Sequence, residues 1–308
     1  MTPVLRNWTN NLHIVAARIK KTSGKADGFM KIDSHHHLWA INDTDYVWMT
    51  EAHDVIRRNF LAPDLHAALD ESGIDGSVAV QARQMIAETD FLLATADTNP
   101  RIKAVVGWVP LCENGGEPFL ERYAAHPKLR GVRHVVHDEP DDHFVLRPDF
   151  NAGIRNLAKY HLTYDLLIFW KHLPQTIQFV DMHPNQPLVV DHIAKPRILA
   201  GNFDTDWATG IRELAKRENV SCKISGMLTE VHGETWDLEL LRPYFETVYE
   251  AFGPQRVMFG SDWPVSLLRS SHAGWTRVCA DLTENLDAAA QAAFWGGNAA
   301  RIYQIPNC

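Results

Sequence analysis

The feature that most constrains the fold is a regular alternation between short apolar runs and longer segments with helical spacing, from residue 30 to the C-terminus. Several runs are almost continuously apolar, for example Ser77-Val-Ala-Val-Gln81, as is typical of strands buried on both faces of a parallel sheet. Eight strands are predicted, at residues 31–35, 75–81, 103–110, 131–136, 162–168, 188–193, 220–225 and 256–261.

The segments between these strands have apolar residues at three-to-four spacing, which predicts helices at residues 64–72, 88–99, 118–126, 149–161, 174–183, 206–218 and 238–252. About eight β/α units in roughly 280 residues predict an α/β fold, a single-domain (β/α)8 TIM-like barrel. A doubly wound open sheet is the alternative, but no GxGxxG follows a strand and no P-loop is present.

The barrel is expected to span residues 30–308, after a poorly ordered, basic extension at residues 1–29. The formal net charge of −8 leaves no basic stripe for nucleic acid, and no apolar run is long enough to cross a bilayer. The four cysteines form no CxxC pair, which favours reduced thiols in the cytoplasm. We therefore expect a monomer or small homo-oligomer whose partner is a small molecule.

Polar residues recur at the carboxyl ends of the predicted strands, where the active sites of barrels are assembled. One such residue is more often part of a turn, but seven strands that carry them would bring them into one cavity. Loops at residues 38–63 and 138–143 are expected over its mouth. The strand-end residues are His35, His37, Gln81, Arg83, Arg133, His134, His137, Asp191, His192, Lys223, Ser225 and Asp262, and Asp165 lies inside the fifth strand.

Three consecutive histidines end the first predicted strand. The period of two sends Asp33, His35 and His37 to one face and His36 to the other, where it should tolerate replacement. Two imidazoles on one face can share one cation, which predicts a metal site. The alternative is a polar strand end whose histidines bind carbonyl groups.

His192 is a plausible third imidazole, and Asp262 is a carboxylate at the end of the last strand. With His35 and His37 they suit one divalent ion that keeps an open position for water. Such an ion lowers the pKa of its water from about 15.7 to about 7, and Asp262 could accept the remaining proton. The alternative for Asp262 is a helix cap or an Asx turn, which the following Trp-Pro favours.

The other strand-end side chains suit contacts with a polar ligand. Arg133 and Arg83 would donate charge-assisted hydrogen bonds to a carbonyl or carboxylate, unless they form structural salt bridges. Tryptophans after the strands could carry the apolar side of a sugar ring, although core packing explains them equally well. The expected substrate-binding residues are Trp39, Gln81, Arg83, His134, Asp165 and Trp263.

Four motifs in order, Asp33-Ser-His-His-His-Leu-Trp39, Gln81-Ala-Arg83, Asp191-His-Ile-Ala-Lys-Pro196 and Phe259-Gly-Ser-Asp-Trp-Pro264, resemble the lactonase branch of the amidohydrolase superfamily. The resemblance runs from about Met30 to the C-terminus. It implies a TIM-like barrel that hydrolyses a sugar-acid lactone, with L-fucono-1,5-lactone as the expected substrate. It also implies catalytic roles for Asp262 as general base, His192 and Arg133, and family metal positions at His35, His37, His192 and Asp262.

The sequence departs from the two-metal members of that superfamily in two places. The run Gly131-Val-Arg-His-Val-Val136 has no lysine to be carboxylated, and Asp165 stands where those members have a histidine. One metal ion, expected to be zinc, is therefore the prediction, and direct polarisation of the carbonyl by the histidines and Arg133 without a tightly held metal is the alternative. A metal-dependent decarboxylase and a non-catalytic sugar-acid binding barrel are the competing functions.

Overall fold

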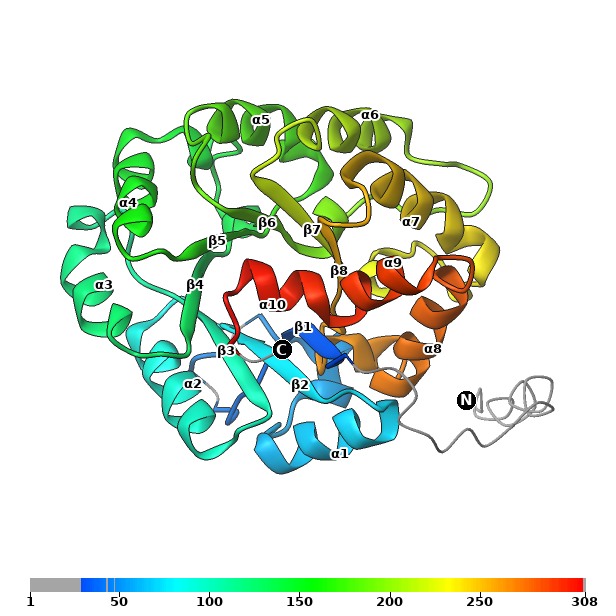
Figure 1. Cartoon of the computed structure of the whole chain (residues 1–308), viewed down its shortest axis with the longest axis horizontal. Coiled ribbons are helices and arrows are strands. Elements are labelled where there is room, and N and C mark those ends of the chain that lie inside the picture. The colour runs from blue at the N-terminus through cyan, green and yellow to red at the C-terminus, as the bar shows by residue number, and fades with distance from the viewer. Residues whose placement is uncertain (1–28, 43, 47, 307–308) are drawn as a thin grey trace, which may run out of the picture.

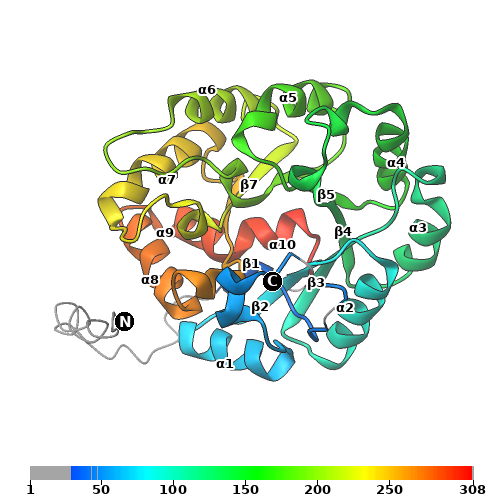
Figure 2. The same cartoon turned by 180° about the vertical axis from the view of Figure 1, so that it is seen from behind.

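The computed structural model describes residues 29–42, 44–46 and 48–306, so the predicted extension lies outside the described residues except for Phe29. Eight parallel strands follow one another around a barrel in chain order (Figures 1 and 2). They are β1 Ile32–His36, β2 Gly76–Val80, β3 Ile102–Gly107, β4 Leu129–His134, β5 Thr163–Leu166, β6 Leu188–Val190, β7 Val220–Ile224 and β8 Val257–Phe259.

The first and last strands meet at their carboxyl ends. The amide of His37 donates to the carbonyl of Trp263 at 2.7 Å, and the amide of Asp262 donates to the carbonyl of His35 at 2.8 Å. These bonds join β1 to the segment that follows β8. The predicted (β/α)8 barrel is confirmed, and the open doubly wound sheet is excluded.

Helices surround the strands, and the C-terminal helices α9 and α10 lie across one end of the barrel (Figure 1). The seven predicted helices are confirmed with end shifts of a few residues, while α8, α9 and α10 were not among the predicted ranges. The helices are α1 Ala62–Ser72, α2 Ile86–Thr98, α3 Glu117–Ala124, α4 Pro148–Lys159, α5 Leu173–Asp181, α6 Thr205–Leu214, α7 Leu238–Phe252, α8 His272–Leu282, α9 Ala288–Ala292 and α10 Asn298–Ile302.

The apolar side chains form two clusters. The larger one fills the space between the strands and the surrounding helices. The smaller one combines side chains of five strands with Ala299 of α10, Tyr303 and Ile305. The carbonyl of Ile302 also accepts a hydrogen bond from Thr163 at the start of β5. The C-terminal segment therefore closes the amino ends of the strands, and a ligand must approach from their carboxyl ends.

The pairing of β1 with β2 is irregular between Asp33 and His36. Ile32 packs in the small inner cluster, whereas Asp33 is 3.0 Å from the Nε2 of His272 in the outer helix α8. The prediction that Asp33 shares a face with His35 is therefore wrong, because the irregular pairing interrupts the alternation of side chains.

In the part of the chain that the structure describes, no helix is both long and apolar enough to cross a bilayer. Cys112, Cys222 and Cys279 are free thiols, and Cys308 lies outside the described residues.

Candidate active site

Four predicted site residues converge at the carboxyl end of the barrel. The Nε2 atoms of His35 and His37 are 3.2 Å apart. The Oδ1 atom of Asp262 lies 3.3 Å from Nε2 of His37 and 3.8 Å from Nε2 of both His35 and His192. Side chains from β1, from the turn after β6 and from the turn after β8 thus surround one point.

The second ring nitrogen of each imidazole has its own partner. Nδ1 of His37 is 2.8 Å from the carbonyl of Val80, and Nδ1 of His192 is 2.8 Å from the hydroxyl of Ser225. Nδ1 of His35 is 3.2 Å from the carboxylate of Asp191. Because a carbonyl only accepts, Nδ1 of His37 carries the proton and Nε2 of His37 has a free lone pair. Nδ1 of His35 lies within reach of both the Asp191 carboxylate and the Lys223 ammonium group.

This arrangement fits a metal ion. Three potential ligand atoms, Nε2 of His35, Nε2 of His37 and Oδ1 of Asp262, lie within 3.8 Å of one another, so a cation placed between them would contact all three. Ligand atoms about 2.0–2.1 Å from a tetrahedral ion are separated by about 3.3 Å, close to the distances observed here. One ligand atom each from His35, His192 and Asp262 lie within 4.8 Å of one another. These residues can therefore hold a metal ion.

Burial and mutual charge shift the pKa values of the cluster. Burial would raise the pKa of Asp262, but His192, His37 and His35 outweigh it and hold that pKa below its usual range. Burial lowers the pKa of His192 to about 4 and that of His35 well below its usual value. The carboxylate is thus ionised and these two imidazoles are neutral at pH 7, the protonation states needed for a base and for metal ligands.

Two members of the cluster lie on left-handed backbone. Asp262 has φ 57°, and the turn after β6 has φ 53°, 49°, 60° and 48° at His192, Ile193, Ala194 and Lys195. Each such residue costs roughly 1–2 kcal/mol relative to the right-handed region. The indole of Trp207 in α6 donates to the carbonyl of Ile193 at 2.6 Å and helps to hold the turn. Backbone strain of this kind concentrates at functional sites.

A buried charged layer lies next to the cluster. Nζ of Lys223 is 2.6 Å from Asp165, 2.9 Å from Asp191 and 3.1 Å from Nδ1 of His35. Nη1 of Arg133 is 2.9 Å from Asp191 and 3.3 Å from Nε2 of His35. Asp191 therefore links two cations to the imidazole of His35, and the guanidinium of Arg133 borders the cluster.

Asp165 is part of this buried charged layer and is not positioned to contact a substrate. Its side chain is fully buried, and its carboxylate binds Lys223 and the hydroxyl of Tyr303, 2.8 Å away. Burial and the charge of Asp191 raise the pKa of Asp165 to about 6, although Lys223 lowers it. The predicted role is corrected, because both of its neighbours occupy the oxygens that a ligand would need.

Three other predicted substrate residues lie next to strand ends but are held by the protein. Arg83 binds Asp45 at 2.5 Å and Glu88 at 2.8 Å. Nε2 of His134 is 2.6 Å from Glu139. The amide of Gln81 donates to the carbonyl of Arg133 at 3.3 Å, while its Oε1 has no hydrogen-bond partner among the described residues. Their contact with a substrate stays a prediction.

The two predicted tryptophans, Trp39 after β1 and Trp263 after β8, both pack against Phe60 in the loop that follows β1. Trp39 has no exposed surface, its ring contacts Tyr46 and Phe60, and its indole donates to the carbonyl of Arg58. A direct sugar contact for Trp39 is therefore corrected to a packing role beside His37. The ring of Trp263 packs against Phe60 and is 4% exposed.

Lys223, Asp191 and Ser225 were expected at strand ends without an assigned role, and Tyr303 was not predicted to lie near the site. The signal for Lys223 was present, since a lysine inside the apolar run 220–225 has to find a buried partner. Tyr303 carried no comparable signal, because its contact depends on how the C-terminal segment crosses the barrel.

Comparison with known proteins gives consistent relatives. The chain is 39% identical over 293 residues to an L-fucono-1,5-lactonase of Burkholderia multivorans, covering 91% of this chain and 97% of that protein. It is 36% identical over 282 residues to an L-fucono-1,5-lactonase of Burkholderia ambifaria, covering 89% and 96% of the two chains.

A crystal structure of an amidohydrolase from Burkholderia multivorans with bound zinc superposes with a TM-score of 0.85 at 38% identity, covering 90% of this chain and all of that one. The amidohydrolase family matches residues 32–305, which include all eight strands and the four-residue cluster. This chain belongs to the amidohydrolase family.

Proposed function

We propose that this protein hydrolyses a sugar-acid lactone to the open aldonic acid, with L-fucono-1,5-lactone as the preferred substrate. The observation that carries the proposal is the convergence of the Asp262 carboxylate with the Nε2 atoms of His35, His37 and His192. The 39% identity to an L-fucono-1,5-lactonase supports the choice of substrate.

The chemistry follows from the protonation states. The lactone carbonyl lies against the imidazoles and the guanidinium of Arg133, which stabilises the negative charge that develops on its oxygen. Asp262, ionised among the histidines, removes a proton from the attacking water. The new C–O bond forms, the bond to the ring oxygen breaks, and the proton held by Asp262 passes to the leaving oxygen.

We also propose zinc as the ion that these residues hold, through His35, His37, His192 and Asp262. The donor atoms of His35, His192 and Asp262, which lie within 4.8 Å of one another, the 3.3 Å distance from Nε2 of His37 to Asp262, and the zinc in the related structure support this assignment. When bound, zinc would act as a Lewis acid on the carbonyl. Metal analysis of the purified protein should find about one zinc per chain, and the His35→Ala variant should lose it.

A panel of L- and D-aldonolactones, assayed for acid release with and without a chelator, tests the proposal. We expect hydrolysis of L-fucono-1,5-lactone, and loss of rate on chelation if zinc takes part. Absence of acid release from every lactone would refute the proposal. Carbon dioxide release from carboxylated acids would then indicate a decarboxylase, and tight binding of a sugar acid without turnover would indicate a binding protein.

A further inference from the structure

The left-handed turn after β6 connects His192 of the cluster to Lys195 at the carboxyl end of the barrel. His192 and Lys195 stand at its two ends, and the amide of Lys195 donates to the carbonyl of His192 at 2.8 Å. Ile193 and Ala194 between them are fully buried. The position of Lys195 is thus set by the same turn that aims His192 at Asp262.

Lys195 forms an ion pair with Glu230, which lies in the loop after β7. Backbone hydrogen bonds join the two loops, from the amide of Ile198 to the carbonyl of Glu230 at 3.2 Å and from the amide of His232 to the carbonyl of Ile198 at 2.8 Å. The side chains of Lys195 and Glu230 are each 15% exposed. The pair is therefore held in place but remains accessible from solvent.

Aromatic and imidazole rings flank this pair. Nζ of Lys195 is 5.7 Å from the ring centre of Phe169, and that ring stacks on His137 with centres 4.8 Å apart. Nδ1 of His137 has no hydrogen-bond partner among the described residues.

The chemistry of this group matches a polyhydroxylated ring. An ammonium group only donates hydrogen bonds and a carboxylate only accepts them, whereas each sugar hydroxyl does both. Aromatic faces bind the apolar side of such a ring. We infer that Lys195 and Glu230 form a subsite that binds ring hydroxyl groups of the lactone and so determines which sugar lactone is accepted. This inference rests on the proposed function.

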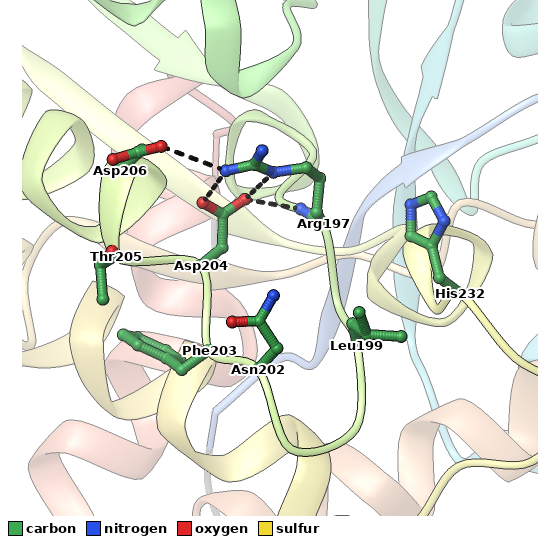
Figure 3. A pocket seen from close by; sticks show the side chains of 8 residues that line it. All are labelled: Arg197, Leu199, Asn202, Phe203, Asp204, Thr205, Asp206 and His232. Carbon is green, nitrogen blue, oxygen red and sulfur yellow. Dashed lines mark hydrogen bonds and ion pairs between the residues drawn. The ribbon is translucent and has the colours of Figure 1, made fainter.

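The next part of the same loop does not offer an equivalent group. Arg197 lines a surface cavity of about 430 Å³ with Phe203, Asp204, Asp206 and His232, among others (Figure 3). Its guanidinium points toward Asp204 and Asp206, with a 2.7 Å contact to Asp204, and away from His232 (Figure 3). Arg197 is thus already paired with two carboxylates at the start of α6.

The test compares two lactones that share the reacting bond but differ in hydroxyl groups, L-fucono-1,5-lactone and unsubstituted δ-valerolactone. In the Lys195→Met and Glu230→Gln variants, the ratio of kcat/KM for the hydroxylated lactone to kcat/KM for δ-valerolactone should fall roughly 10- to 100-fold, mainly through KM. Lys216→Met removes an exposed ion pair with Glu213 and serves as the control, with an unchanged ratio.

An unchanged ratio in both variants would overturn the inference. The inference would also be overturned if kcat/KM fell by the same factor for both lactones, because Lys195 would then act on the ester group that both lactones contain. If the wild-type protein hydrolyses neither lactone, the proposed function fails instead, so the two failures are distinguishable.

Discussion

His36 stands between two imidazoles of the cluster but lies in a different environment. It is fully buried, its Nδ1 is 3.5 Å from the carbonyl of His37, and its Nε2 has no hydrogen-bond partner in the described part of the chain. The charges that act on it include those of Asp33 and His272, which lie on the side of α8. Its neighbours His35 and His37, by contrast, approach each other through their Nε2 atoms.

Replacement of the two adjacent histidines should therefore have unequal effects on catalysis. His37→Ala removes a donor atom from the cluster and should lower kcat/KM for the lactone by about 100-fold or more. His36→Ala should change kcat/KM by less than about threefold while it lowers stability. Steady-state kinetics on folded protein checks this, and equal losses would show that the assignment of the faces of β1 is wrong.

His36 should also contribute to the pH dependence of stability. Burial lowers its pKa to about 4, below the unfolded value near 6.5, so its contribution is fully present above pH 6.5 and is lost as the pH falls toward 4. Between pH 7 and pH 4 the wild type should lose roughly 3 kcal/mol more unfolding free energy than His36→Ala. Urea titrations at several pH values measure this difference, and parallel curves would contradict it.

Single residues show where sequence reasoning succeeded and where it stopped. The period of two correctly brought His35 and His37 together, because their side chains alternate along one strand. It failed for Asp33, since a pairing irregularity with β2 leaves no mark on the sequence of β1. Trp39 could not be placed either, because its burial depends on the fold of a loop.

Among the elements, the turn after β6 is the most unusual. Four consecutive residues other than glycine have positive φ, and two of them, Ile193 and Ala194, are buried in the hydrophobic core. The backbone conformation costs energy that packing and the bond from Trp207 offset. Nothing in the apolar run at residues 188–193 predicts this turn. The run was predicted to be a strand throughout, whereas β6 ends at Val190.

The substitution Ala194→Gly tests the conformation of this turn. Glycine adopts φ 60° without steric cost, so the stability should be unchanged or increase. The control Ala208→Gly, at a buried position inside α6, should lose about 1 kcal/mol. Thermal or urea unfolding compares the two, and equal losses would show that Ala194 is not strained.

At the scale of the whole molecule, buried charges connect the barrel interior to the site. Arg133 of β4, Asp165 of β5 and Lys223 of β7 lie where apolar side chains would normally fill a barrel. Tyr303 binds Asp165, Asp165 binds Lys223 and Lys223 binds His35, so the C-terminal segment is linked to His35 through hydrogen-bonded side chains. The layer fixes the orientation of the imidazole that faces Asp262.

Lys223→Met should be strongly destabilising because it leaves the carboxylates of Asp165 and Asp191 without their shared cation. A loss of about 3–5 kcal/mol in unfolding free energy is expected. Lys171→Met removes a half-exposed pair with Asp142 and should cost about 1 kcal/mol or less. Urea denaturation measures the unfolding free energy of both variants. Similar small losses would show that the buried charged layer does not depend on Lys223.

The barrel itself was predictable from sequence because its strands are apolar and its helices have regular spacing, as in α7, whose ends were predicted correctly. The four-residue cluster was predictable because barrel geometry gathers strand ends. The charged layer was only partly so, since the pairing of Lys223 with Asp165 depends on strand register, and the contact of Tyr303 depends on the path of the C-terminal segment.

The measurement that tests the central claim most directly is the rate of acid release from L-fucono-1,5-lactone by the wild type and by Asp262→Asn. The wild type should hydrolyse the lactone, and the variant should be slower by roughly 10²–10⁴-fold with a nearly unchanged unfolding temperature. Near-full activity in the folded Asp262→Asn protein, or no acid release by the wild type, would contradict the account.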